Sequence, residues 1–402
     1  MTALPLAWAF LRRRWGQALP ALLAGALGIA AVELVLIAER ELPKAAERAF
    51  GGVDLVIGPK GSALDLVLCC ALQVSEPRGL IPLEPALALV KQPLVRAAAP
   101  IALGDNFRGR RIIGTTPELL SVYGAKFAQG GPWSAPLQAV VGAEAAHALD
   151  LELGQKFVGA HGLGAGGEEH TEFPYTVTGI LAPTGSALDR VVLTSIESVW
   201  LIHQHHEAEE ATTRGEAAPA DAPPAATAIL AALRSPVALA SMPRQIDATE
   251  RFSAAVPAFE MARLSRAARP IISTIMAIGL LFAALAAATA AAALAATVSA
   301  RVRDLALLRM LGAHPWELAA IAMAESVMLA LGSLVLGLAG VLIVAPFAAD
   351  ILAERDGLLL RVLPTGWDLA WLLGGALTVA VAIAMIPAIR AARAAIERVL
   401  TP

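Results

Sequence analysis

One short run in the chain carries residue types that bind transition metals. It holds three histidines followed closely by three glutamates: His203, His205, His206, Glu207, Glu209 and Glu210. Imidazole nitrogen and carboxylate oxygen are ligands that a borderline metal such as zinc accepts. The run opens a polar, acidic, Pro- and Ala-rich segment, 203–226, whose composition predicts a flexible loop. Such a loop does not preorganise a tetrahedral site, and a solvated linker accounts for the same residues, so both interpretations stay open.

The two cysteines, Cys69 and Cys70, are neighbours in the sequence. They cannot form a spaced ligand pair or a disulfide framework. We interpret them as small apolar packing residues, because free cysteine is often used in this way. A vicinal disulfide and a metal contact are the alternatives.

The sequence shows no motif for nucleotide binding or hydrolysis. The run GVDLVIGPKGS, which contains Lys60, does not satisfy the spacing of a phosphate-binding P-loop, and a strand followed by a turn explains it. Neither an HExxH zinc motif nor a GxSxG nucleophile elbow is present. We therefore expect a chain without catalytic activity and without a cofactor of its own.

A basic, Leu-rich segment lies between two apolar stretches near residue 305. Its arginines alternate with leucines up to a glycine that ends the helix, and Glu317 lies in the turn that restarts it. The pattern predicts a short helix within 299–317 whose apolar face docks into a groove of a soluble partner. A role in orientation and lipid contact is the alternative. The docking residues are Arg301, Arg303, Asp304, Leu307, Leu308, Arg309, Leu311 and Gly312.

Composition places these segments in a membrane protein. The chain is 57% hydrophobic and 16% charged, and its mean hydropathy is +0.65. Four segments have the length and composition of transmembrane helices, namely 17–38, 270–298, 318–349 and 368–389. The net charge of −3 provides no basic field for nucleic acid. We predict a four-helix membrane protein with an α+β extracytoplasmic domain, 39–269, inserted between the first and second spans.

The arginines predict the orientation. They cluster in the N-terminal segment 1–16, in 299–317 and in the tail 390–402. Under the positive-inside rule these three regions are cytoplasmic, whereas 39–269 and the short loop 350–367 lie outside. A cleaved signal peptide is the alternative for the first span, but its apolar run continues without a convincing cleavage site.

Two acidic residues lie inside the predicted spans. A charge at the centre of a bilayer costs about 2.5–3.5 kcal/mol on insertion scales, so each requires an explanation. Glu33 lies near the outer end of its span, and we expect it to reach water. Glu325 lies about two turns inside the third span, where we expect it to cap or pair within the helix bundle. A proton relay is the alternative, but the sequence shows no chain of partners for it.

The segment 39–269 is long enough for a packed domain. We predict strands at Val53–Gly58, Arg111–Thr116, Tyr175–Leu181 and Arg190–Ser195. Helices are predicted near 117–124 and 140–151, and the Gly-rich run 161–170 predicts a hairpin loop. The last part, 243–269, predicts a stalk helix that leads into the second span, with interruptions near Pro257 and Pro270.

The run RVRDLALLRMLGAHPWEL, followed by Glu325, resembles the FtsX/MacB/LolE-type ABC transporter permeases. The run GPWSAPLQAVVGAEAAHALDLELGQKF and the strand YTVTGIL are similar to the periplasmic core of the MacB proteins. Other runs, such as LTSIESVWLIHQHH, resemble a subgroup of bacterial permeases that often carries a His-rich loop at this place.

This resemblance implies a bacterial inner-membrane homodimer that works with two copies of a separate ABC ATPase, which binds ATP and Mg. It implies that 301–312 contacts the ATPase and that motion passes to the periplasmic domain for export or extraction of a substrate. A periplasmic adaptor, a lipoprotein or a hydrolase are further candidate partners besides membrane lipids. The alternative is an FtsX-like regulator that activates a periplasmic cell-wall enzyme.

Overall fold

The computed structural model describes residues 3–13, 15–162, 167, 169–213, 223–300, 314–356 and 362–392. The chain forms two compact units. One, the membrane unit, contains residues 1–41, 267–350 and 361–402, and the other, the core domain, contains 42–266 and 351–360. The long helices α2 (Trp15–Phe50) and α9 (Pro257–Ala300) each contribute residues to both units.

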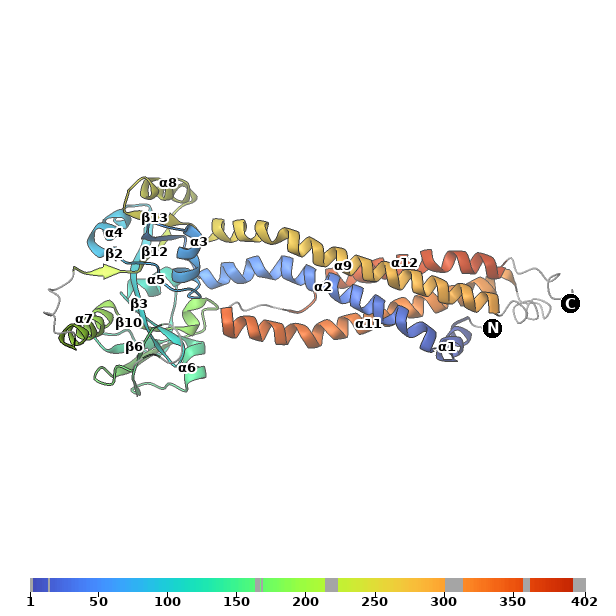
Figure 1. The fold of residues 1–402 in the computed structure, drawn as a ribbon, viewed down its shortest axis with the longest axis horizontal. Helices are drawn as coiled ribbons and strands as arrows, with labels where there is room; N and C mark the ends of the chain where they lie inside the picture. Colours follow the sequence, from blue (N-terminus) through green and yellow to red (C-terminus); the bar gives the residue numbers. More distant parts are fainter. Residues whose placement is uncertain are drawn as a thin grey trace. The chain divides into compact units, whose positions relative to one another are not determined.

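The membrane unit is helical. Besides parts of α2 and α9 it contains α1 (Ala3–Arg13), most of α11 (Pro315–Asp356) and α12 (Gly366–Ala392) (Figure 1). Three of the described helices have the length and apolar character to cross a bilayer, over Ala18–Phe50, Pro257–Ala292 and Pro315–Ile351. In α12 the described apolar stretch is shorter and covers Gly366–Ala382.

Glycines let the membrane helices approach closely. A Cβ on Gly28 of α2 would lie 2.8 Å from the backbone nitrogen of Ala283 and 3.0 Å from the carbonyl oxygen of Gly279, both in α9. On the α11 side, a Cβ on Gly337 would lie 2.7 Å from the carbonyl oxygen of Ala26. Small residues are the common means of helix association in membranes, because the lipid tails provide no hydrophobic drive between helices.

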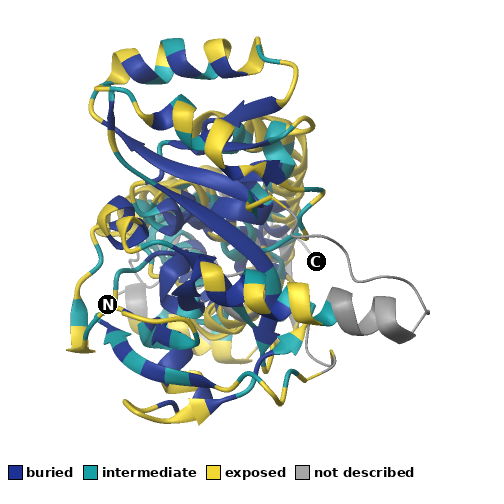
Figure 2. Ribbon diagram, turned by 90° about the vertical axis from the view of Figure 1, so that its left-hand side faces the viewer, coloured by how far each residue is buried: buried dark blue, intermediate teal, exposed yellow. Residues whose placement is uncertain are grey.

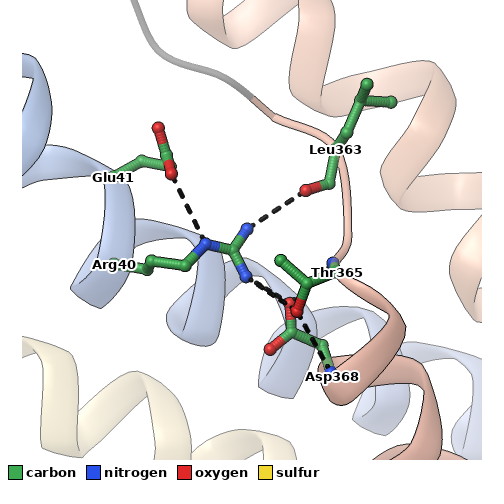
Figure 3. A network of polar contacts seen from close by, with 5 residues as sticks. All are labelled: Arg40, Glu41, Leu363, Thr365 and Asp368. Atoms are coloured by element: carbon green, nitrogen blue, oxygen red, sulfur yellow. Dashed lines mark hydrogen bonds and ion pairs between the residues drawn. The ribbon is translucent and has the colours of Figure 1, made fainter.

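A polar network joins α2 to the start of α12. The Arg40 guanidinium forms an ion pair with Asp368 and donates a hydrogen bond to the carbonyl oxygen of Leu363 at 3.1 Å (Figure 3). Asp368 and Thr365 also form a reciprocal cap, in which each side chain accepts a hydrogen bond from the other's backbone N–H, at 2.8 and 3.3 Å. The cap satisfies backbone donors that the helix itself leaves open.

The core domain is built on one mixed sheet of 11 strands. Its main path is β13-β1-β12-β3-β4-β10-β6-β9-β5, with β7 on β9, β8 on β3, and a separate pair of β2 and β11. The strands are β1 (Leu55–Pro59), β2 (Ile81–Pro82), β3 (Val95–Phe107), β4 (Arg110–Thr115), β5 (Phe127–Gly130), β6 (Gln138–Val141), β7 (Lys156–Phe157), β8 (Ala160–His161), β9 (Tyr175–Leu181), β10 (Val192–Ser195), β11 (Ala225–Ala226), β12 (Ala228–Leu233) and β13 (Phe252–Ala255).

Apolar clusters cover both faces of this sheet, and its strands are buried along most of their length (Figure 2). On one face, Leu103, Ile113 and Leu193 pack with the end of α2 and with two short helices. On the other face, Ile112, Val192 and Tyr175 pack with Ile202. The helices of the domain are α3 (Ala63–Leu66), the π-helix η1 (Val67–Ala71), α4 (Leu83–Val90), α5 (Glu118–Tyr123), α6 (Ala143–Leu149), the 3-10 helix η2 (Ala187–Arg190), α7 (Ile196–Thr213) and α8 (Pro236–Asp247).

Two expectations about secondary structure are wrong. Residues 203–213 of the predicted flexible loop belong to α7, because Val199 and Ile202 bury one face of this helix and anchor it on the sheet. The predicted stalk does not begin at residue 243: α8, which begins earlier, ends at Asp247, strand β13 follows, and α9 begins with Pro257. Proline suits the first turn of a helix, where its missing N–H would have no partner.

The expectation that Glu33 reaches water is also wrong. Its exposed fraction is 0%, and neither carboxylate oxygen has a hydrogen-bond partner among the described residues. Within the membrane unit, Glu33 therefore lies inside the helix packing. Glu325 on α11 is buried as well, with an exposed fraction of 6%.

Candidate functional site

The candidate site of the core domain starts from Asp105 on β3. The pairing of β3 with β4 shifts at Gly104, so that Leu103 faces Ile113 and Asp105 faces Ile112. One extra residue on a strand in this way is a β-bulge, and it changes the face to which the next side chain points. Asp105 consequently lies on the same side of the sheet as Ile112, against α7, and its exposed fraction is 0%.

A hairpin segment brings two histidines beside Asp105. Strand β8 pairs with β3 so that His161 lies opposite Asp105, and Ala160 forms a bridge with Glu169, next to His170. The Asn106 side chain supports this segment, because its amide donates to the carbonyl oxygens of Ala160 and Gly162 at 3.3 and 3.1 Å.

Helix α7 places a third histidine at the same point. His203 follows Ile202 and lies one turn after Val199, so it shares the helix face that covers the sheet. A Cβ on Gly104 would overlap the His203 ring, so the bare glycine backbone makes room for it. His206, one turn further along α7, stacks on His161 with ring centroids 5.3 Å apart.

The three nitrogens surround one carboxylate oxygen. Oδ1 of Asp105 lies 3.4 Å from Nε2 of His170, 3.5 Å from Nε2 of His203 and 3.8 Å from Nδ1 of His161. The ligand atoms of Asp105, His161 and His203 all lie within 4.8 Å of one another. Neither oxygen of Asp105 has a hydrogen-bond partner among the described residues, and the same holds for Nε2 of His170.

Burial shifts the pKa of two groups beside Asp105, namely His161 and Tyr175. Burial lowers the pKa of His161, and the neighbouring His203 lowers it further, although the Asp105 charge acts in the opposite direction. Burial also raises the pKa of the Tyr175 hydroxyl, and the Asp105 charge adds to this effect. The Tyr175 hydroxyl has no hydrogen-bond partner among the described residues. Next to the buried carboxyl group of Asp105, these shifts favour the neutral forms of the His161 imidazole and the Tyr175 phenol.

A polar cavity of 150 Å³ lies beside the cluster and is lined by His170, His205 and His206, together with Glu169 and Glu172. His170, whose side chain is 8% exposed, is the residue of the Asp105 cluster with the shortest distance to Oδ1 that also lines this cavity. The residues His161, His170, His203 and Asp105 are of the types that can hold a metal ion.

The structure brings only some of the metal ligands predicted from the sequence to the Asp105 cluster. His203 and His206 join the cluster, whereas His205 points elsewhere: its Nε2 lies 3.6 Å from a carboxylate oxygen of Glu172, and its ring meets Phe173. The side chains of Glu207, Glu209 and Glu210 lie outside the described residues. Asp105, His161 and His170 were not among the predicted ligands. The one available hint was that two of the seven histidines flank a Gly-rich hairpin.

The other predicted site residues belong to the membrane part of the chain. The docking helix, Arg301 to Gly312, lies entirely outside the residues that the structure describes. Glu33 and Glu325 are buried in the membrane unit, as described above. An apolar cavity of 110 Å³ lies between α2, α9, α11 and α12 and includes Ser326 and Ser333.

The neighbouring cysteines Cys69 and Cys70 lie in η1 and belong to an apolar cluster of the core domain. Both thiols are buried and free. The hydrogen bond from Cys70 and the nearby Arg111 guanidinium lower the pKa of Cys69, and the same pairing together with burial raises the pKa of Cys70. No disulfide joins the two sulfurs in this structure.

Two protein-family models match the chain, one over its N-terminal part and one over its C-terminal part. The model of the MacB-like periplasmic core domain matches residues 19–249, and that of the FtsX-like permease C-terminal region matches residues 276–396. The chain belongs to the FtsX/MacB-type ABC permeases. The resemblance inferred from sequence motifs is thus confirmed, and the chain is a membrane protein of a family that works with an ABC ATPase.

Two solved structures are similar to about half of the chain. The periplasmic region of MacB from Actinobacillus actinomycetemcomitans is 14% identical, with a TM-score of 0.35, and the match covers 54% of this chain and 95% of that one. The extracellular domain of the noncanonic ABC-type transporter YknZ from Gram-positive bacteria is 11% identical, with a TM-score of 0.29 and coverages of 50% and 98%. No curated protein sequence matches the chain.

Proposed function

We propose that this chain is the permease subunit that couples ATP hydrolysis by a separate ABC ATPase to movement of its extracytoplasmic core domain. The observation that carries the proposal is that a MacB-like core and an FtsX-like permease region together account for most of the chain. The chain itself contains no P-loop, so the nucleotide chemistry belongs to the partner. Export or extraction of a substrate at the periplasmic side is the work that this motion performs.

The proposed layout has four spans, with both termini cytoplasmic and the core domain inserted after the first span. The arginine clusters support this orientation. The fourth span uses α12, whose described apolar stretch is the shortest of the four. Reporter fusions at residue 402 and within 350–367 test the layout: a cytoplasmic reporter active at the first position and inactive at the second is expected.

Transmission in this proposal uses α2 and α9. Each is one uninterrupted helix that contains both apolar residues of a span and residues of the core domain. A helix transmits displacement along its axis because its backbone hydrogen bonds are satisfied within the element. Two copies of the permease and two of the ATPase form the working unit in the bacterial inner membrane.

The decisive experiment concerns the predicted docking helix. A Leu308→Asp, Arg309→Glu double variant of the full chain is purified from native membranes, and the co-purifying ABC ATPase is quantified per permease chain. Loss of most of the ATPase is expected, because the first change removes apolar contact and the second reverses a charge. The matched control is Arg251→Glu, the same charge reversal at an exposed position of the core domain. A normal ATPase ratio in the double variant contradicts docking through this helix.

A further inference from the structure

We infer that Asp105, His161, His170 and His203 form a binding site for one zinc ion in the core domain. Nothing in the coupling of ATP hydrolysis to motion requires this site, so it stands independently of the proposed transport function. The inference rests on the convergence of four ligand groups from three separate elements: β3, the β8 hairpin segment and α7.

The distances from Asp105 to the three histidines are close to those of a tetrahedral zinc site. Ligand atoms that each lie about 2.0–2.1 Å from a tetrahedral zinc are about 3.3–3.4 Å from one another. Two of the nitrogens, those of His170 and His203, lie 3.4 and 3.5 Å from Oδ1 of Asp105, and that of His161 lies 3.8 Å away. The ligand atoms of Asp105, His161 and His203 lie within 4.8 Å of one another, and His170 joins them through its distance to Asp105.

The burial of Asp105 is the second, independent observation. A carboxylate with an exposed fraction of 0% and without hydrogen bonds is costly unless a cation compensates its charge. The described surroundings of Oδ1 supply imidazoles rather than a lysine or arginine. A divalent ion supplies positive charge beside Asp105 and gives Nε2 of His170 a partner at the same time.

The ligand types select the class of metal. Three imidazoles and one carboxylate suit zinc and its transition-metal neighbours, whereas calcium and magnesium prefer sites made only of oxygen. The site is also preorganised. His203 is fixed by α7 and Gly104, and His161 by the pairing of β8 with β3 and by the Asn106 amide.

The polar cavity of 150 Å³ is lined by one of the four proposed ligands, His170, together with His206. Bound zinc links α7 and the hairpin to the central sheet, so occupancy of the site stabilises the core domain.

The test uses the full chain without a polyhistidine tag, purified in detergent and stripped of metal. Zinc alone is titrated in competition with a chromophoric chelator, and bound metal is counted by mass spectrometry. One zinc per chain is expected, and magnesium and calcium are expected not to compete. Asp105→Asn, His170→Ala and His203→Ala are each expected to weaken zinc binding more than tenfold. The matched control is His205→Ala on the same helix, which is expected to bind like the parent chain.

A spectroscopic measurement keeps the test decisive where a variant folds poorly. Cobalt(II) replaces zinc in the unchanged chain, and the visible absorption bands report its coordination. Intense bands of a four-coordinate ion are expected, and they are expected to be lost on addition of equimolar zinc. Weak bands of six-coordinate cobalt, absence of stoichiometric zinc, or an equal loss of binding in His205→Ala would each overturn the inference.

Discussion

The imidazole of His203 fills the space in which a side chain at Gly104 would lie. Helix α7 and strand β3 are about a hundred residues apart in sequence, yet this pair fixes the distance between them at the candidate metal site. Glycine at this position is required by a neighbouring element rather than by its own backbone angles.

The first prediction concerns this pair. In Gly104→Ala, the new methyl group displaces the His203 ring from Asp105, and we expect zinc affinity to fall about tenfold or more. The added volume is also expected to lower the free energy of unfolding of the core domain by about 1–3 kcal/mol. Chelator competition and thermal unfolding of the full chain measure the two effects.

The control for that prediction is Gly131→Ala. A Cβ on Gly131 has no atom within 4 Å, so both zinc affinity and thermal stability are expected to stay unchanged. If Gly104→Ala binds zinc as tightly as Gly131→Ala, the contact between Gly104 and His203 does not position the site.

The second prediction concerns the cap of α12. Thr365→Ala removes one half of the reciprocal cap with Asp368, and we expect the free energy of unfolding to fall by about 1 kcal/mol. Unfolding of the detergent-solubilised chain in a denaturant series measures this change. Thr378→Ala on the same helix is the control, because its exposed hydroxyl only donates a local hydrogen bond to the carbonyl oxygen of Gly374. Equal losses in the two variants would contradict a capping role.

The third prediction concerns the ion pair between Arg40 and Asp368, whose side chains are 21% and 13% exposed. A double-mutant cycle with Arg40→Gln and Asp368→Asn is expected to give a favourable coupling energy of about 0.5–1 kcal/mol. The coupling is expected to decrease at high salt, since charges near the surface are screened. A coupling energy of zero at low salt would show that the pair contributes no stability.

The fourth prediction concerns the close approach of α2 and α9. Gly28→Val places two methyl groups against the backbone of Ala283, and we expect a loss of about 1–3 kcal/mol in the stability of the membrane unit. Gly340→Val on α11 is the control, because a Cβ there has no atom within 4 Å. Denaturation in mixed detergent micelles compares the two variants, and equal stability of both would exclude tight packing at Gly28.

The fifth prediction concerns the pH dependence of the thiol pair. Because Cys70 and Arg111 lower the pKa of Cys69, its reactive thiolate form appears at a lower pH than that of Cys70. Alkylation followed by peptide mass spectrometry is therefore expected to modify Cys69 first as the pH rises. In Arg111→Met, the onset for Cys69 is expected to move to higher pH. An unchanged onset would remove Arg111 from this account.

Much of the fold was predictable because its elements follow local patterns. The strand Tyr175–Leu181 was predicted with its observed bounds, since its alternation of buried and half-buried residues follows the period of two of a strand. The helix α7 was missed because its first half is apolar and its second half is acidic, and composition favoured a loop over 203–226. The segment is helical because Val199 and Ile202 of α7 pack in the buried core of the domain.

The candidate site was predictable only in part. The histidines of α7 are neighbours in sequence and attracted attention, but Asp105, His161 and His170 come from other elements. Asp105 joins them only because β3 carries an extra residue, a β-bulge, at Gly104. The local sequence contains no pattern that predicts this bulge. The docking helix was predicted from its own sequence, and it stays a prediction because it lies outside the described residues.

The bulge in β3 gives a way to sort related permeases by sequence. Without its extra residue, the carboxylate would point to the opposite side of the sheet, and the histidines of the hairpin and of α7 would have no shared anchor. We therefore expect five positions to be conserved or lost together among related permeases: Gly104, Asp105, His161, His170 and His203. A relative that keeps Gly104 and Asp105 but lacks the histidines, or keeps the histidines but lacks Gly104 and Asp105, is expected not to bind zinc at this site.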